Sequence, residues 1–189
     1  MPPSSGPPAV VLIGPPGSGK STVARGLARH LGLTSRDTDL DIEQAARKPI
    51  REIFVDDGES AFRDLERAAV ATALASHDGV LALGGGAVLD PLTEAALVAY
   101  VRGGGVVVYL DVTLAHAAPR VGFNQARPLL LGNPRAQWKA LMESRRPIYE
   151  RVATVSISTD GATPEQVVLL VAAALEHQHT ETSGSDDDE

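Results

Sequence analysis

The segment VLIGPPGSGKST, residues 11–22, constrains the fold more than any other part of this sequence. The apolar run at residues 9–13 has the composition of a buried strand, and STVARGLARHLG has apolar residues at helical spacing. Between them, GPPGSGKS from Gly14 to Ser21 matches the pattern G-x-x-x-x-G-K-[ST] of a phosphate-binding loop, or P-loop. A strand, a glycine-rich loop and a helix in this order predict a nucleoside triphosphate site in an α/β fold.

The chemistry of this loop follows from its residue types. Glycines allow successive backbone N–H groups to point inward, and they form an anion site at the N-terminus of a helix, where the helix dipole also favours phosphate. We expect Lys20 to reach the β- and γ-phosphates and the Ser21 hydroxyl to ligate Mg²⁺.

The remainder of the chain alternates short apolar runs with longer helical patterns, which is typical of βαβ units and a parallel sheet. The further strands are expected at SRDTD and at residues 79–83, 106–110 and 154–158. Helices are expected at residues 39–47, 59–76, 91–101, 135–149 and 164–176.

The bulk composition predicts one compact domain. With 189 residues, 43% of them hydrophobic, the chain is long enough for one buried core and short for two. The absence of cysteine excludes a disulfide framework and a cysteine-ligated zinc site. No apolar stretch approaches the roughly eighteen residues of a membrane span, and MPPSSGPP lacks the pattern of a secretion signal. We therefore expect a cytoplasmic protein that contacts no membrane.

The net charge of −7 is concentrated at one end of the chain. The final nine residues, ETSGSDDDE, contain five acids and no base, and without them the net charge is −2. A nearly neutral body offers no basic surface to nucleic acid, so we expect no such partner. Residues 1–8 and 178–189 are predicted to be disordered tails around a domain at residues 9–177.

Glycines and prolines predict a mobile loop, or lid, at about residues 120–134.

The sequence favours a kinase over a nucleotide-driven switch. It has no N-K-x-D motif for reading guanine, and its only other lysines are Lys48 and Lys139. A kinase needs an acceptor site with a carboxylate to take a hydroxyl proton and cations to hold an anionic group. A nucleotide kinase and a small-metabolite kinase both remain open at this point.

Three segments are candidates for the acceptor site. RDTD places Asp37 and Asp39 two residues apart, so both would face the same side of an extended strand end. FRDLE places Arg63 and Glu66 on one face of a predicted helix. LGGGAV follows a predicted buried strand with glycines at residues 84–86, where a ligand can approach the backbone closely.

Each segment has a simpler interpretation. Asp37 or Asp39 would also serve as the cap of the following helix, and Arg63 with Glu66 would also form an ordinary surface ion pair. The three glycines would also form a tight turn. Asp111 ends an apolar strand and competes with Asp37 as the carboxylate nearest the metal.

Taken together and in order, GPPGSGKST, DTD, FRDLE, LGGGAV, ARPLL and RRPIY resemble the motifs of the shikimate kinase family, from about residue 9 to residue 171. The resemblance implies an adenylate-kinase-like P-loop fold: a three-layer sandwich around a five-stranded parallel sheet, with a mobile lid. It also implies transfer of the ATP γ-phosphate to the 3-hydroxyl of shikimate in chorismate biosynthesis, with ATP and Mg²⁺ bound. We expect the chain to be a monomer.

The resemblance also implies residue roles. Asp39 would bind the shikimate hydroxyls and act as the base, Lys20 and the lid residue Arg127 would act on the phosphates, and Ser21 with Asp37, usually through water, would hold the metal. The implied ATP-binding set is Gly17, Ser18, Gly19, Lys20, Ser21, Thr22, Arg120 against the adenine, and Arg127. The implied shikimate-binding set is Asp39, Arg63, Gly84, Gly85, Gly86 and Arg145, with the two arginines on the carboxylate.

The sequence departs from the family pattern in two places. RRPIY offers two adjacent arginines, of which Arg145 has the family spacing to the proline and Arg146 is the alternative. The family often has an arginine near the adenine after the last strand, whereas this chain has TDGATP. Gluconate kinase, a nucleoside monophosphate kinase and an ATP-sensing P-loop module without activity are the competing hypotheses. The glycine run and RDTD argue against gluconate kinase.

Overall fold

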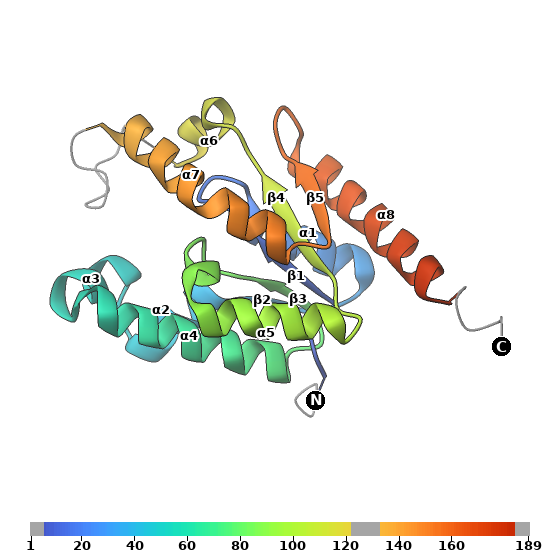
Figure 1. The fold of residues 1–189 in the computed structure, drawn as a ribbon, viewed down its shortest axis with the longest axis horizontal. Coiled ribbons are helices and arrows are strands. Elements are labelled where there is room, and N and C mark those ends of the chain that lie inside the picture. The colour runs from blue at the N-terminus through green and yellow to red at the C-terminus, as the bar shows by residue number, and fades with distance from the viewer. Residues whose placement is uncertain (1–5, 122–132, 184–189) are drawn as a thin grey trace.

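The computed structural model describes residues 6–121 and 133–183, which form a five-stranded parallel sheet with helices on both faces (Figure 1). The strands are β1 (Val10–Ile13), β2 (Ser35–Asp37), β3 (Val80–Ala82), β4 (Val107–Asp111) and β5 (Val155–Ser158), in the spatial order β2-β3-β1-β4-β5. Their register pairs Val11 with Leu81 on one side and with Val107 on the other. The predicted fold class is confirmed.

Two helical layers cover the sheet because its central strands are apolar on both faces. On one face, α1 (Lys20–Leu31) and α8 (Pro164–Ser183) pack together against Leu12 and Val108. On the other face lie α4 (Gly58–Ser76), α5 (Pro91–Arg102) and α7 (Pro134–Val152), which contribute Val70, Leu97 and Tyr149 to a second core with Ile13. The sheet is therefore the middle layer of three.

Two smaller groups of elements lie beyond these layers, next to the carboxyl ends of the strands. The first contains α2 (Thr38–Ala46) and α3 (Ile50–Asp56), which pack on α4 around Ile42, Ile53 and Phe62. The second contains α6 (Leu114–Val121), which packs on α7 through Val121 and Trp138. The short 3₁₀ turn η1 (Ala87–Leu89) follows the glycine run. Among the described residues no helix is both long and apolar enough to cross a membrane.

The described part of the chain extends into both predicted tails, so both tails are shorter than predicted. Pro8 is buried, and its carbonyl accepts a hydrogen bond of 2.8 Å from the Tyr100 hydroxyl, so the ordered part begins before residue 9. Residues 178–183 are the last residues of α8, which ends at Ser183. The remaining tail residues, 1–5 and 184–189, lie outside the described part of the chain.

The structure assigns residues at both ends of the predicted lid to helices or their caps. Residues 120–121 are the last residues of α6, a helix that the sequence did not predict. Asn133 caps α7, which begins at Pro134. Residues 122–132, including Arg127, lie outside the described residues, so the mobility of the lid and the role of Arg127 stay predictions.

The helix α3 was also not predicted, and α7 ends three residues beyond its predicted end, at Val152.

Candidate active site

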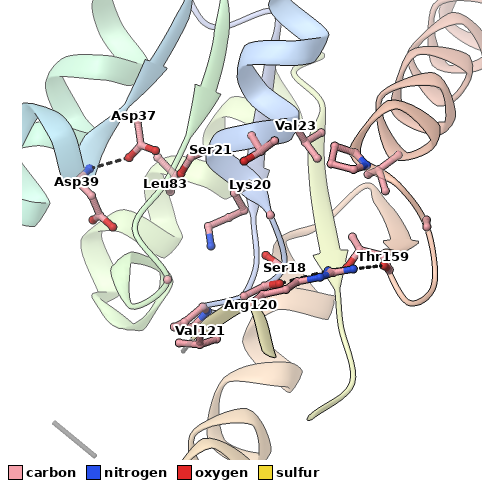
Figure 2. A pocket seen from close by; sticks show the side chains of 18 residues that line it. Ser18, Lys20, Ser21, Val23, Asp37, Asp39, Leu83, Arg120, Val121 and Thr159 are labelled. Carbon is pink, nitrogen blue, oxygen red and sulfur yellow. Dashed lines mark hydrogen bonds between the residues drawn. The ribbon is translucent and has the colours of Figure 1, made fainter. Parts of the chain in front are cut away.

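A cavity of about 560 Å³ lies at the edge of the sheet where the parallel strands end (Figure 2). The P-loop follows β1, Asp37 ends β2, Leu83 follows β3 and Thr159 follows β5, so the topology alone brings these four segments to one edge. The predicted site residues that line it are Gly17, Ser18, Gly19, Lys20, Ser21, Thr22, Asp37, Asp39, Gly85 and Arg120. Of the residues predicted to bind the acceptor, Asp39 and Gly85 line this cavity, whereas Arg63, Gly84, Gly86 and Arg145 do not.

The P-loop has glycine at three positions where the backbone conformation favours it. Gly14, Gly17 and Gly19 have φ values of 145°, 88° and 88°, in a region that residues with side chains rarely adopt. The Lys20 ammonium donates hydrogen bonds to the carbonyls of Gly14 at 2.7 Å and Pro15 at 3.2 Å. Burial lowers the pKa of Lys20 to about 8, against the opposing effect of Asp39 and Asp37. An anionic phosphate in the cavity would favour the charged form of this lysine.

Asp37 and Asp39 lie on different elements, although the sequence suggested a shared extended strand end. Asp37 ends β2 and caps α2, and its Oδ1 accepts the N–H of Asp39 at 3.0 Å. Asp39 lies in the first turn of α2, which the capping bond starts at Thr38, one residue before the predicted start at residue 39. Capping and function do not exclude one another, since both carboxylates line the cavity.

The carboxyl group of Asp39 has an unusual environment. Its pKa is raised to about 6, mainly by burial and also by the negative charges of Asp37 and Glu66, while Lys20 acts in the opposite direction. In Figure 2 the Lys20 side chain extends between Asp39 on one side and Arg120 on the other. A carboxylate with a pKa close to neutral, beside a phosphate-binding lysine, is suited to accept a proton during phosphoryl transfer.

Arg63 and Glu66 form more than a surface ion pair. Arg63 Nη1 lies 2.6 Å from Glu66 Oε2, and Glu66 is only 2% exposed. Burial raises the pKa of Glu66, and the adjacent Arg63 opposes that rise. Arg63 also contacts Glu59 of the preceding turn at 3.2 Å. The guanidinium is thereby held where α4 faces the glycine run.

The glycine run is adjacent to these charged side chains. A Cβ atom on Gly86 would lie 2.6 Å from Arg63 Nη1, and one on Gly84 would lie 2.9 Å from Glu66 Oε1 and even closer to Asp39. A side chain at either position would therefore require these charged groups to shift. The N–H of Gly84 donates to the buried Thr38 hydroxyl at 3.0 Å, which ties the run to the start of α2.

The two adjacent arginines of α7 point to different partners. Arg145 Nη1 donates to the Gly85 carbonyl at 3.0 Å, and Arg145 is close enough to Lys20 to act on its pKa. Arg146 instead forms a bidentate pair with Asp111, with distances of 2.8 and 2.9 Å. This geometry favours Arg145 over Arg146 for the site. The pair also argues against Asp111 as the carboxylate nearest the metal, because the Asp111 carboxylate is bound to Arg146 and Asp111 does not line the cavity.

Arg120 closes the opposite end of the cavity. Its guanidinium donates to the Thr159 hydroxyl at 3.1 Å and to the Thr159 carbonyl at 3.0 Å, and it lies 3.3 Å from the Gly17 carbonyl. Ala162, Pro164 and Val167 supply the apolar wall beside it. The surface at this end of the cavity thus combines backbone and apolar groups.

Several residues of the site were missed by sequence reasoning. Thr159 holds Arg120, Trp138 donates to the Pro16 carbonyl of the P-loop at 3.4 Å, and the Tyr149 hydroxyl donates to the Gly85 carbonyl. Tyr149 lies inside the quoted RRPIY motif, so the motif was a signal for it. Thr159 is the first residue of the quoted TDGATP, so that segment was a signal for it. Trp138 has no comparable signal, since its contact links segments that are distant in the sequence.

The described residues contain no group of three or more potential metal-ligating side chains. Mg²⁺ usually takes one or two protein ligands and completes its shell with water and substrate phosphates. Ser21 and Asp37 offer a hydroxyl and a carboxylate in the same cavity, and both are hard oxygen donors. The donor set therefore fits such an ion.

Comparisons with known proteins agree with this arrangement. A family model described as shikimate kinase matches residues 16–176. The chain belongs to the shikimate kinase family. A shikimate kinase from Salinispora arenicola is 59% identical over 168 residues, covering 89% of this chain and 98% of that protein. The shikimate kinase from Streptomyces coelicolor is 56% identical over 169 residues, covering 89% and 96%.

Solved structures of the shikimate kinase family have the same fold. The enzyme from Acinetobacter baumannii, in complex with shikimate, superposes with a TM-score of 0.83 at 31% identity, covering 91% of this chain and 94% of that one. A gluconokinase from Sinorhizobium meliloti reaches a TM-score of 0.63 at 20% identity, which shows a common fold alone. As a member of the shikimate kinase family, the chain is an ATP-dependent small-molecule kinase.

Proposed function

We propose that this cavity brings ATP and shikimate together, and that the chain transfers the γ-phosphoryl group to the 3-hydroxyl of shikimate, giving shikimate 3-phosphate and ADP. The observation that carries this proposal is that Lys20, Asp39 and Gly85 line one cavity. A phosphate-binding cation and a carboxylate base at one edge of the sheet give the positioning that phosphoryl transfer requires.

In the proposed reaction Asp39 accepts the proton of the shikimate hydroxyl. The oxygen then forms a bond to the γ-phosphorus while the bond from that phosphorus to the ADP oxygen breaks. Support comes from the position of Asp39 in the cavity and from its pKa of about 6, which leaves the carboxylate ionised but basic near neutral pH. Lys20, in the same cavity, would balance the negative charge of the transferring group.

The nucleotide would lie along the P-loop, with its phosphates at the N-terminus of α1 and its base beside Arg120. Ser21 and Asp37 would hold Mg²⁺, which supplies charge neutralisation at the phosphates when it is bound. Arg127, outside the described residues, keeps its predicted role at the phosphates. A monomer stays the expected state of the chain. The cytoplasm stays the expected compartment.

The acid group of shikimate would bind between α4 and α7. Arg63 of α4 is next to Gly86, and Arg145 of α7 contacts the Gly85 carbonyl. Two guanidinium groups from opposite sides of the glycine run can hold a carboxylate by paired hydrogen bonds, a geometry that lysine does not reproduce.

An assay coupled to ADP release tests this function. We expect turnover with ATP, Mg²⁺ and shikimate, and none when gluconate or a nucleoside monophosphate replaces shikimate. Turnover with gluconate alone would contradict the proposed acceptor. ATP hydrolysis that no acceptor stimulates would indicate an ATPase or a sensor.

A further inference from the structure

The carbonyl of the middle glycine, Gly85, accepts two hydrogen bonds from the same helix. Arg145 Nη1 donates to it at 3.0 Å, and the Tyr149 hydroxyl donates to the same oxygen. Residues four apart lie on one face of a helix, so α7 presents both side chains to the glycine run together. The Gly85 carbonyl is thus an acceptor against which the Arg145 guanidinium is oriented.

The two donors differ in their surroundings. Tyr149 is fully buried and its ring stacks on Tyr109, with the ring centroids 5.0 Å apart and the planes at 18°. Burial raises the pKa of Tyr149 to about 12, so the hydroxyl keeps its proton and stays a donor. Tyr149 therefore has a position set by the core, whereas a long arginine side chain has many rotamers available.

The stacked pair of Tyr149 and Tyr109 connects α7 to the sheet, because Tyr109 lies on β4. The Tyr109 hydroxyl donates to Asp111 Oδ1 at 2.7 Å, and Asp111 holds Arg146 of α7 through the bidentate pair. Two links therefore fix α7 to β4, one through the tyrosine rings and one through the ion pair. They determine where the face that carries Arg145 meets the glycine run.

The glycine run depends on such external anchors because glycine restricts its own backbone least. Within residues 6–121 and 133–183, the N–H groups of Gly85 and Gly86 donate to no protein acceptor. The peptide bond between them is trans, so its N–H points away from the tyrosine that holds its carbonyl. Loss of the hydroxyl would leave Arg145 as the one hydrogen-bond partner of this peptide among the described residues.

We propose that Tyr149 is a positioning residue for acid binding: its hydroxyl fixes the Gly85 carbonyl, and this carbonyl orients Arg145 toward the carboxylate of the substrate. The inference rests on the proposed role of Arg145. Tyr149 itself would touch neither shikimate nor ATP.

The substitution Tyr149→Phe removes the hydroxyl and keeps the stacked ring. We expect the calorimetric Kd for shikimate, measured with ADP bound, to rise about 3- to 10-fold, as for the loss of one buried hydrogen bond. The Kd for ADP should change less than about twofold. Tyr100→Phe is the matched control, because the Tyr100 hydroxyl also donates to a backbone carbonyl, that of Pro8, far from the site. It should leave both affinities unchanged.

A double-mutant cycle separates positioning from a structural effect. If Tyr149 acts through Arg145, Tyr149→Phe should weaken shikimate binding much less in an Arg145→Ala background than in the native chain. Full additivity would overturn the inference, and so would a loss of ADP affinity as large as the loss of shikimate affinity.

The outcomes also distinguish this inference from the proposed function. Unchanged shikimate affinity in Arg145→Ala would overturn the acid clamp itself. Weakened binding in Arg145→Ala with native binding in Tyr149→Phe would overturn only the positioning role. If Tyr149→Phe does not fold, Asp111→Asn weakens the other link of α7 to the sheet, and it should also weaken shikimate binding selectively. Native shikimate affinity in that variant would count against the inference.

Discussion

Asp37 accepts the backbone N–H of Asp39 at 3.0 Å, so the aspartate that ends β2 caps the helix that carries the other aspartate in its first turn. The bond fixes the start of α2, and with it the position of the proposed base. It also keeps two carboxylates close together, and the charge of Asp37 contributes to the raised pKa of Asp39. One short motif thus sets both the place and the basicity of the group that would accept the proton.

Activity should fall in acid as Asp39 becomes protonated. Burial and the neighbouring carboxylates raise its pKa to about 6, and a base must be ionised to accept a proton. We predict that kcat/KM for shikimate is level near pH 8 and declines about tenfold for each pH unit below about 6. A decline that begins only near pH 4 would mean that another group is titrating.

The same raised pKa predicts that Asp39 costs stability at neutral pH. Its carboxyl has a pKa of about 6 in the folded chain against 3.8 for an ordinary aspartate, so its favourable contribution is complete below 3.8 and is lost as pH rises through 6. Asp39→Asn should therefore raise the free energy of unfolding by about 1–2 kcal/mol at pH 7.5. Urea unfolding should show this difference shrinking towards pH 4.5. A difference independent of pH would refute the assignment of this pKa.

Removal of Arg63 should affect the acid more than the nucleotide. We expect Arg63→Ala to raise the Kd for shikimate about 10- to 100-fold, the range for a hydrogen bond to a charged group, with the Kd for ADP nearly unchanged. The variant should also unfold more easily, because Glu66 remains buried without its cation. Arg67→Ala, one turn along α4 and paired with Asp64 and Asp90, is the control. Equal weakening of both ligands by Arg63→Ala would contradict the clamp.

The glycine run can be tested with a single methyl group. A Cβ at Gly86 would lie 2.6 Å from Arg63 Nη1, so Gly86→Ala should displace this guanidinium and raise the KM for shikimate at least several-fold. Gly103→Ala is the matched control, because its Cβ would have only ordinary contacts of 3.4 and 3.6 Å and its φ is −81°. A native KM in Gly86→Ala would show that the arginine adapts without loss.

The sequence predicted the parallel sheet and the P-loop because their signals are local: a buried strand, a glycine pattern and a helix follow one another in residues 9–31. It put Asp39 both at the end of a predicted strand and at the start of a predicted helix, because the capping bond of Asp37, which starts the helix at Thr38, depends on a side-chain conformation that periodicity does not report. It missed α6, since Pro119 interrupts a short pattern of eight residues.

The contacts of α7 were beyond sequence reasoning for a different reason. Neighbouring residues on a helix point about 100° apart, so Arg145 and Arg146 must face different partners, but only the packing of α7 decides which one faces the site. The pairing of Arg146 with Asp111 joins residues 35 positions apart, and the contact of Tyr149 with Gly85 spans 64 positions. Such contacts are set by the fold as a whole.

The most direct test identifies the product. Purified protein incubated with ATP, Mg²⁺ and shikimate should yield ADP and one phosphorylated shikimate in equal amounts, with the phosphate on the 3-hydroxyl by phosphorus and proton NMR. Asp39→Asn should bind ATP normally and form this product about 10²- to 10⁴-fold more slowly, the usual contribution of a general base. Phosphate on a different hydroxyl, no phosphorylated shikimate, or an undiminished rate in Asp39→Asn would contradict the account.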